Sequence, residues 1–201
     1  ALGNITTSYT VGSTVKGATI LTGFKSGVIR PGTVLYDSPI KIKDTPEKSS
    51  WKNFGSLNDI RALRVSSNVY MFKTAIAMGE GNYVFNRPLS IKKETFNTFR
   101  DSFSQFGLGI KTGIDLPNEA SGYKGTLTSP GLLMDMAIGQ YDTYTTMQLA
   151  QYVSTIANGG YRIQPRVVRE IREPLMEVDE LGPVIEEIQP TVLNRVELQN
   201  G

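Results

Sequence analysis

Histidine and cysteine are both absent from this chain of 201 residues. Their absence excludes Ser-His-Asp and Cys-His catalysis, and it removes the usual ligands of zinc. The sequence also contains no apolar run long enough to cross a bilayer. The formal net charge is only +2, and lysine and arginine are scattered along the chain, so the composition gives no sign of a nucleic-acid partner. What remains is an ordinary globular composition, with 39% hydrophobic residues.

In a chain without histidine, a serine nucleophile needs another base, and lysine is a chemically competent one. Ser13 and Lys16 have a spacing that places both side chains on one face of a helix. Gly12 precedes the pair, and a small and apolar run follows it, which predicts a helix that starts at Ser13. A serine in the first turn lies near free backbone N–H groups, which stabilise a developing oxyanion. The alternative interpretation is that Ser13 only caps the helix and Lys16 is exposed.

The same Ser-x-x-Lys spacing recurs elsewhere, so spacing alone identifies no site. The other pairs are Ser38/Lys41, Ser49/Lys52, Ser90/Lys93 and Ser121/Lys124. Three of them lie among polar or turn-forming residues, which predicts surface loops. Ser90 precedes a stretch typical of a helix start and is predicted to be an N-cap.

A second motif, Ser-x-Asn, occurs twice. Ser56-Leu57-Asn58 lies in a cluster of turn formers and is predicted to be a loop or a helix cap. Ser66-Ser67-Asn68 instead lies between two apolar segments, which favours a position facing a cleft. The alternative is that Ser67 or Asn68 caps the helix that follows, and both interpretations are compatible.

Ser-x-x-Lys followed by Ser-x-Asn is the order of motifs found in penicillin-binding proteins and class A β-lactamases. Further segments resemble penicillin-binding transpeptidases in the same order, from about residue 9 to residue 171. The matching segments are Thr10–Lys16, Ile29–Thr33, Ala62–Val69, Phe106–Glu119, Ala137–Gln140, Thr145–Gln148, Ile156–Gly160 and Gln164-Pro165. The resemblance is strongest to the monofunctional, or class B, transpeptidases.

This resemblance implies a D,D-transpeptidase that cross-links peptidoglycan stem peptides and is acylated by β-lactams. It implies Ser13 as the nucleophile, Lys16 as the general base, Ser66 as a proton relay, and Asn68 as the residue that positions Lys16 and the substrate. No cofactor and no metal are implied. The expected partners are stem peptides, β-lactams and cell-wall synthesis proteins such as a glycosyltransferase. The expected location is the extracytoplasmic face of the bacterial membrane.

The third motif of the family, Lys-Thr/Ser-Gly, is not identified within the chain. Lys111-Thr112-Gly113 has the right letters but belongs to the Phe106–Glu119 segment, and Pro117 argues against an internal strand there. Lys25-Ser26-Gly27 is predicted to be a turn that ends a helix. We therefore expect residues 1–201 to be part of a transpeptidase domain, with a membrane anchor and stalk upstream and the third motif downstream. Such a fragment is expected to have little or no transpeptidase activity.

Three alternatives share these motifs. A β-lactam-binding sensor or resistance domain would be acylated without cross-linking anything. A β-lactamase would need a carboxylate that positions a water, and Asp115 and Glu119, the nearest candidates, are better explained as loop structure. A non-catalytic scaffold of a cell-wall complex would not need intact motif residues.

The fold is expected to be α+β and mostly helical, like penicillin-binding transpeptidases and serine β-lactamases but without the C-terminal strands of their sheet. Helices are predicted at 13–23, 57–64, 67–78, 91–105 and 129–138, and after a capping box at Thr145 and Gln148. Strands are predicted at 34–37, 40–42 and 166–171. Four phenylalanines at helical spacing, Phe96, Phe99, Phe103 and Phe106, are predicted to lie in the core. Residues 173–201 are expected to extend along the surface.

Overall fold

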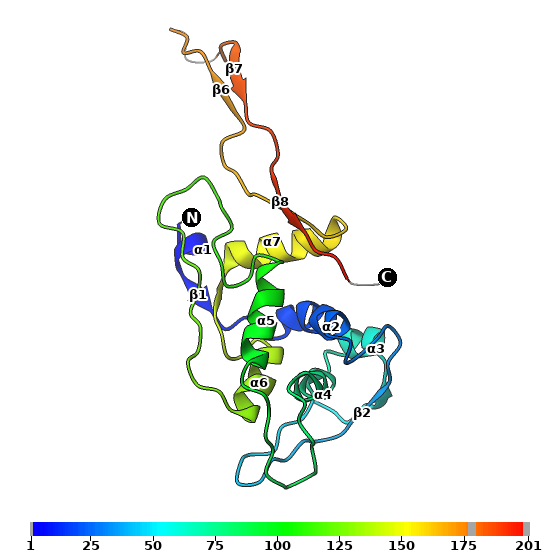
Figure 1. Cartoon of the computed structure of the whole chain (residues 1–201). Helices are drawn as coiled ribbons and strands as arrows, with labels where there is room; N and C mark the ends of the chain where they lie inside the picture. Colours follow the sequence, from blue (N-terminus) through cyan, green and yellow to red (C-terminus); the bar gives the residue numbers. More distant parts are fainter. Residues whose placement is uncertain (1, 177–179, 199–201) are drawn as a thin grey trace.

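A computed structural model describes residues 2–176 and 180–198, which form a helical body and a projecting ribbon (Figure 1). The helices are α1 (Gly3–Thr6), the 3₁₀ helix η1 (Gly12–Val15), α2 (Lys16–Lys25), α3 (Asp59–Arg64), α4 (Asn68–Met78), α5 (Thr95–Ser104), α6 (Pro130–Ala137) and α7 (Thr146–Ala157). The strands are β1 (Ser8–Tyr9), β2 (Leu35–Asp37), β3 (Gly55–Leu57), β4 (Tyr144–Thr145), β5 (Tyr161–Ile163), β6 (Glu170–Arg172), β7 (Val184–Glu187) and β8 (Val192–Arg195). The structure is thus mixed helix and sheet with short strands, as the sequence predicts.

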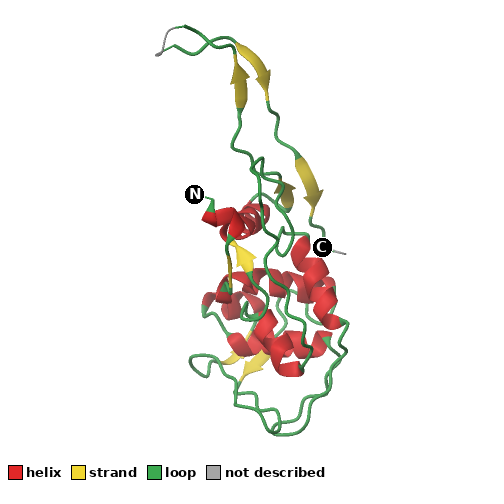
Figure 2. Ribbon diagram, turned by 90° about the vertical axis from the view of Figure 1, so that its left-hand side faces the viewer, coloured by secondary structure: helices red, strands yellow, loops and turns green. Residues whose placement is uncertain are grey.

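The strands form four separate antiparallel pairs, which are β1 with β4, β2 with β3, β5 with β8, and β6 with β7. The first two pairs lie on the helical body. The last pair stands away from it as a two-stranded ribbon (Figure 2), and all four residues of β7 are exposed. The fold that positions the candidate site is therefore set by helix packing and not by a continuous sheet.

Helix α2 lies in the middle of the body and packs against both α4 and α5, while α4 also packs against α6. The predicted aromatic core is confirmed, since Phe96, Phe99, Phe103 and Phe106 are all buried. Phe99 and Phe103 meet edge to face with ring centroids 5.7 Å apart, a favoured aromatic geometry. This packing fixes the axis of α2, the helix that begins at Lys16.

Several predicted helix starts are confirmed by their capping contacts. The Ser67 hydroxyl accepts a hydrogen bond from the Tyr70 amide at the start of α4, and the Ser129 hydroxyl accepts one from Leu132 at the start of α6. Thr145 and Gln148 form the predicted capping box of α7. In the residues that the structure describes, no helix is long and apolar enough to cross a membrane.

Two predictions about local structure are wrong. Residues 40–42 form only the isolated bridges of Ile40 with Lys48 and Ile42 with Arg87, not a strand. β2 pairs with Gly55–Leu57, which the sequence predicts to be a loop or cap. Ser90 does not cap α5, because that helix begins at Thr95 with Glu94 at its N-cap. Asn58, by contrast, does cap α3 by accepting a hydrogen bond from the Arg61 amide.

The C-terminal segment also differs from the prediction. Only the end of the predicted strand 166–171 is a strand, because the amides of Val167 and Val168 donate to the Asp115 carboxylate instead of to a neighbouring strand. Only part of 173–201 lies along the surface of the body. β7 pairs with β6 in the ribbon that stands away from the body, whereas β8 pairs with β5 and Asn194 donates to the Gln105 carbonyl at the end of α5 (Figure 1). Residues 177–179 and 199–201 of that prediction lie outside the described residues.

Candidate active site

Ser13 and Lys16 lie at the junction of η1 and α2, so the predicted helix begins with a 3₁₀ turn. Gly12 has a positive φ of 57°, a conformation that favours glycine, and its amide donates to the Gly139 carbonyl at 2.9 Å. The Ser13 side chain is exposed, whereas Lys16 is only 2% exposed. The interpretation of Lys16 as an exposed lysine is therefore wrong.

The Lys16 ammonium group contacts both motif residues of the Ser66-Ser67-Asn68 turn. Its Nζ lies 2.7 Å from the Ser66 carbonyl oxygen, 2.9 Å from the Ser66 Oγ and 2.7 Å from the Asn68 Oδ1. These three contacts use all three N–H donors of an ammonium group. The fold thus brings the two motifs together, although about fifty residues separate them in the chain.

Burial lowers the pKa of Lys16 from 10.5 to about 8, because desolvation disfavours the charged form. The nearby Asp37 carboxylate acts in the opposite direction and raises the pKa of Lys16. A lysine with a pKa near 8 is neutral in an appreciable fraction of molecules at neutral pH, unlike an ordinary lysine. Lys16 therefore has the proton affinity that a general base needs.

Ser13 and Lys16 are one turn apart. In the part of the chain that the structure describes, their side chains form no hydrogen bond with each other. The contacts of Nζ go to the Ser66-Ser67-Asn68 turn instead. The Ser13 hydroxyl can form a hydrogen bond with the Lys16 Nζ only when Lys16 gives up one of these three contacts. Long or absent catalytic hydrogen bonds are common in proteins without bound substrate.

The Ser66-Ser67-Asn68 turn has an unusual backbone conformation. Ser66 has a positive φ of 54°, which is uncommon for a residue other than glycine. Its amide donates to the Leu63 carbonyl, and the Ser67 amide donates to Ala62, so the turn is held against the end of α3. This conformation presents both the carbonyl and the hydroxyl of Ser66 to Lys16.

Asp37 and Ser50 also belong to this region, and the sequence analysis did not identify either. The buried Ser50 hydroxyl donates to the Asp37 Oδ2 at 2.8 Å, and the Ser67 hydroxyl donates to the same oxygen. Asp37 ends a predicted strand and Ser50 lies in a polar loop, so neither position has a local pattern of its own. The available signal was a carboxylate at the last position of the predicted strand of residues 34–37.

Tyr152 on α7 supports the turn that carries Ser13. Its buried hydroxyl accepts a hydrogen bond from the Ala18 amide at 3.1 Å and donates to the Thr14 carbonyl at 3.1 Å. A side chain on Gly17 would collide with this hydroxyl, since an added Cβ would lie 2.7 Å from it. The sequence analysis also missed Tyr152, because α7 is distant in the chain.

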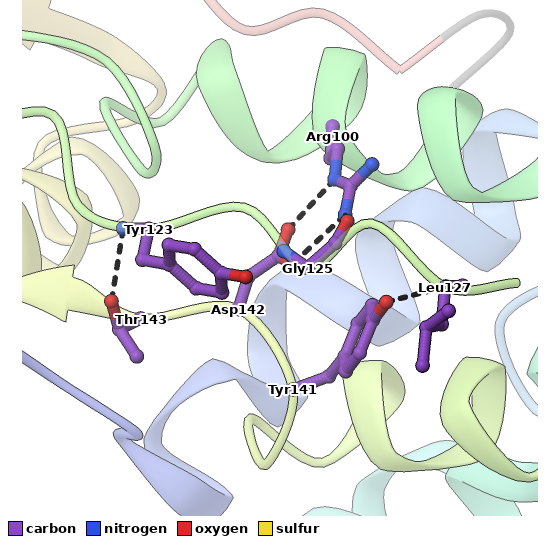
Figure 3. Close-up of polar contacts among 7 residues, drawn as sticks. All are labelled: Arg100, Tyr123, Gly125, Leu127, Tyr141, Asp142 and Thr143. Atoms are coloured by element: carbon purple, nitrogen blue, oxygen red, sulfur yellow. Dashed lines mark hydrogen bonds and ion pairs between the residues drawn. The ribbon is translucent and has the colours of Figure 1, made fainter.

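The segment that contacts Gly12 is itself fixed by an ion pair. Gly139 is followed closely by Asp142, whose carboxylate forms a two-pronged contact with Arg100 at 2.8 and 2.9 Å (Figure 3). Asp142 also accepts from the Gly125 amide at 2.9 Å, and Arg100 donates to the Gly125 carbonyl. Tyr123 and Thr143 form two hydrogen bonds with each other, so the loop of residues 123–127 is held against this segment (Figure 3).

The other sequence candidates have structural roles. Lys111-Thr112-Gly113 lies in a loop and not in a strand, where the Glu119 carboxylate accepts hydrogen bonds from Thr112 and Gly113. Asp115 holds the amides of residues 167 and 168, and these contacts lower its pKa. Among the residues described, no cluster of three acidic side chains could hold a metal ion.

Comparison with known proteins assigns the chain to a family. The family model described as "Penicillin binding protein transpeptidase domain" matches residues 1–200. Penicillin-binding protein 2A of Bacillus subtilis is 54% identical over 202 residues, which cover 100% of this chain and 28% of that protein. Penicillin-binding protein 2B of Streptococcus pneumoniae is 37% identical over 207 residues, which cover 100% of this chain and 30% of that protein.

A solved structure supports the same assignment. The structure of penicillin-binding protein 2B from Streptococcus pneumoniae strain 5204 superposes with a TM-score of 0.90 at 36% identity. The alignment covers 97% of this chain and 33% of that one. The chain thus spans about a third or less of the relatives that it matches. The chain belongs to the penicillin-binding protein transpeptidase family, and within it to the class B proteins.

Proposed function

We propose that this chain belongs to a serine D,D-transpeptidase that cross-links peptidoglycan stem peptides through an acyl-enzyme on Ser13. One observation carries the proposal. Lys16 is buried one turn from an exposed serine, with a pKa lowered to about 8, and it contacts both Ser66 and Asn68. In a chain without histidine, this lysine is the group suited to activate the serine.

In the proposed acylation step, neutral Lys16 takes the proton of the Ser13 hydroxyl while Oγ attacks the carbonyl carbon. A neutral amine has two N–H donors and one lone pair. These donors serve the Ser66 carbonyl and the Asn68 Oδ1, and the lone pair is free to accept a proton. The Ser66 hydroxyl then lies 2.9 Å from Nζ and relays a proton to the departing amine. The step is balanced in protons, because the proton that leaves Ser13 ends on the leaving group.

The substrate of this step is the terminal D-Ala-D-Ala of a stem peptide. The bond between the two alanines breaks, the terminal D-alanine leaves as its amine, and the remaining acyl group stays on Ser13. An amine of a second stem peptide then attacks the ester and returns a proton to Ser13. The Ser13 amide lies in the first turn of η1, where backbone N–H groups lack intrahelical partners and suit an oxyanion.

The whole protein is proposed to be longer than this chain. Its relatives are bacterial penicillin-binding proteins, of which this chain covers 28% and 30%, which supports a longer, membrane-anchored protein acting at the extracytoplasmic face. Members of this family bind peptidoglycan and β-lactams. The proposed partners are therefore stem peptides, β-lactams and other proteins of cell-wall synthesis such as a glycosyltransferase.

The test is the intact mass after incubation with benzylpenicillin, followed by peptide mapping, on both this chain and the longer protein that contains it. We expect a penicilloyl adduct on the peptide carrying Ser13 in the longer protein, and its loss in Ser13→Ala. Ser90→Ala is the matched control, because Ser90 is exposed and has the same spacing to Lys93. An adduct on another serine, or none in the longer protein, would contradict the proposal.

A further inference from the structure

Asp37 is a buried carboxylate that the mechanism above does not use. It ends β2, is only 2% exposed, and its Oδ2 accepts hydrogen bonds from two hydroxyls, those of Ser50 and Ser67. Within residues 2–176 and 180–198 it forms no ion pair. A buried carboxylate balanced by hydroxyls alone is costly, which is unexpected unless its charge or its geometry is used.

The two hydroxyls that meet Asp37 also meet the first amides of α4. A hydroxyl has one proton, so donating it to Asp37 leaves the lone pairs free to accept. The Ser50 Oγ accepts from the amides of Asn68 at 2.9 Å and Val69 at 3.2 Å. The Ser67 Oγ accepts from the Tyr70 amide at 3.0 Å. A contact between the two hydroxyls is longer, at 3.3 Å.

Asp37 thus orients both hydroxyls toward the N-terminus of α4, where three successive amides lack intrahelical partners. That same N-terminus carries the Ser66 and Asn68 groups that contact Lys16. Resting on the proposed function, we propose that Asp37 is a positioning residue for acyl transfer, acting through Ser50 and Ser67 to hold the Ser66-Ser67-Asn68 turn against Lys16.

The charge of Asp37 supplies a second, separable effect. Burial lowers the pKa of Lys16 and the pKa of Lys73 on α4, and the charge of Asp37 acts against this larger effect in both lysines. The Lys73 Nζ donates to the Tyr36 carbonyl, beside Asp37 on β2. The charge of one buried carboxylate therefore acts on the pKa values of lysines on two different helices. Replacing Asp37 by Asn keeps an acceptor oxygen but removes the charge, whereas Ala removes both.

The test compares Asp37→Ala and Asp37→Asn in the longer protein, with the rate of acylation by benzylpenicillin measured against pH. For Asp37→Ala we expect the plateau rate at high pH to fall at least about tenfold, because displacing groups of an active site lowers the reaction rate by this much or more. For Asp37→Asn we expect a plateau within about threefold of wild type. Its pH midpoint should move to lower pH, because losing a negative charge lowers the pKa of Lys16. Asp101→Asn, an exposed aspartate on α5, is the matched control.

Circular dichroism and thermal unfolding show whether each variant folds. If Asp37→Ala does not fold, Ser50→Ala replaces it, because α4 then keeps its Ser67 cap. Ser50→Ala is expected to lower the plateau of the wild-type protein. Where Asp37→Ala folds, adding Ser50→Ala to it should lower the plateau much less, because the linkage is already broken. A folded Asp37→Ala or Ser50→Ala protein with an unchanged plateau overturns the proposal.

A second readout separates this inference from the proposed function. Hydrogen exchange at the amides of Asn68, Val69 and Tyr70 needs no acylation, and Asp37→Ala is expected to accelerate it. The titration of the Lys16 Cε signal by NMR is likewise independent of chemistry at Ser13. If wild type forms no adduct on Ser13 but these two signals respond, the proposed function fails and the link from Asp37 to Lys16 stands. If neither signal responds, the link itself is wrong.

Discussion

Two buried aspartates, Asp37 and Asp142, are equally hidden but are satisfied in different ways. Asp142 is 3% exposed and meets the guanidinium of Arg100 through both carboxylate oxygens. Asp37 is 2% exposed and meets only the hydroxyls of Ser50 and Ser67. A paired carboxylate has its charge neutralised locally, whereas a carboxylate held by hydroxyls keeps a field that reaches other groups.

The difference shows that burial alone does not tell what a charged group does. In the Arg100–Asp142 pair the two charges neutralise each other, and Asp142 also holds the loop at Gly125 by a hydrogen bond. Its expected contribution is therefore to stability. The field of Asp37 instead acts on Lys16, and its contacts order the turn opposite that lysine. Three sets of variants test this contrast, taken in order of decreasing expected effect.

Removing Asp142 should lower the free energy of unfolding more than it lowers the rate of acylation. We expect Asp142→Ala to lower the free energy of unfolding by about 3–5 kcal/mol, because it leaves the Arg100 charge, which is mostly buried, without a partner. Urea unfolding followed by circular dichroism measures this loss. Acylation by the folded fraction should fall less than it does in Asp37→Ala, because Asp142 acts on Ser13 only through the segment that contacts Gly12.

Asp101→Ala is the control for that experiment, since Asp101 is exposed on the same helix as Arg100. It should change stability by less than about 0.5 kcal/mol. The contrast between the two buried aspartates would collapse if Asp142→Ala slowed acylation of the folded protein as much as Asp37→Ala does.

The buried lysine should make stability depend on pH in the alkaline range. Lys16 has a pKa of about 8 in the folded protein against 10.5 for an ordinary lysine. Between these values the unfolded chain binds a proton that the folded protein has released, so stability rises with pH. The rise is on the order of 3 kcal/mol from the size of the pKa difference.

The measurement is the difference in unfolding free energy between wild type and Lys16→Met from pH 7 to pH 11. Other titrating groups cancel in this difference. A difference that stays flat across the window would show that Lys16 is not desolvated, and a difference that falls would reverse the sign of the argument.

A neutral buried group should matter less than either charge. Tyr152→Phe removes the hydroxyl that joins the Thr14 carbonyl to the Ala18 amide, and leaves that buried amide without its partner. We expect a loss of about 1–2 kcal/mol in unfolding free energy. Tyr161→Phe, at a tyrosine that is 41% exposed on β5, is the matched control and should be nearly neutral. An equal effect of the two substitutions would show that the loss does not come from the hydrogen bonds of the Tyr152 hydroxyl.

The sequence predicted the motif residues because each motif is local. Ser13 and Lys16 lie within one turn, and Ser67 caps the helix that follows its own triplet. Helices were predicted well for the same reason, since caps and apolar spacing are local signals. The pairing of β2 with β3 was missed, because the alternation of residues in a strand does not indicate which other strand it will meet.

The parts of the site that were missed come from distant elements. Asp37, Ser50 and Tyr152 lie in a strand, a loop and a late helix, and they act by contacts that only the folded chain creates. The predicted strand at 166–171 failed in a similar way. Its alternating pattern is real, but the Asp115 carboxylate takes the amides that a strand would have used.

The most direct test of the account is the pH dependence of Ser13 acylation by benzylpenicillin, measured from pH 6 to pH 10 in the longer protein and in Lys16→Met. The account predicts a rate that rises with pH to a plateau with a midpoint near 8, because Lys16 must lose its proton before it can accept one from Ser13. It also predicts that Lys16→Met loses this acylation. A rate that stays constant over the range, or a Lys16→Met protein acylated at the wild-type rate, would contradict the assignment of Lys16 as the base.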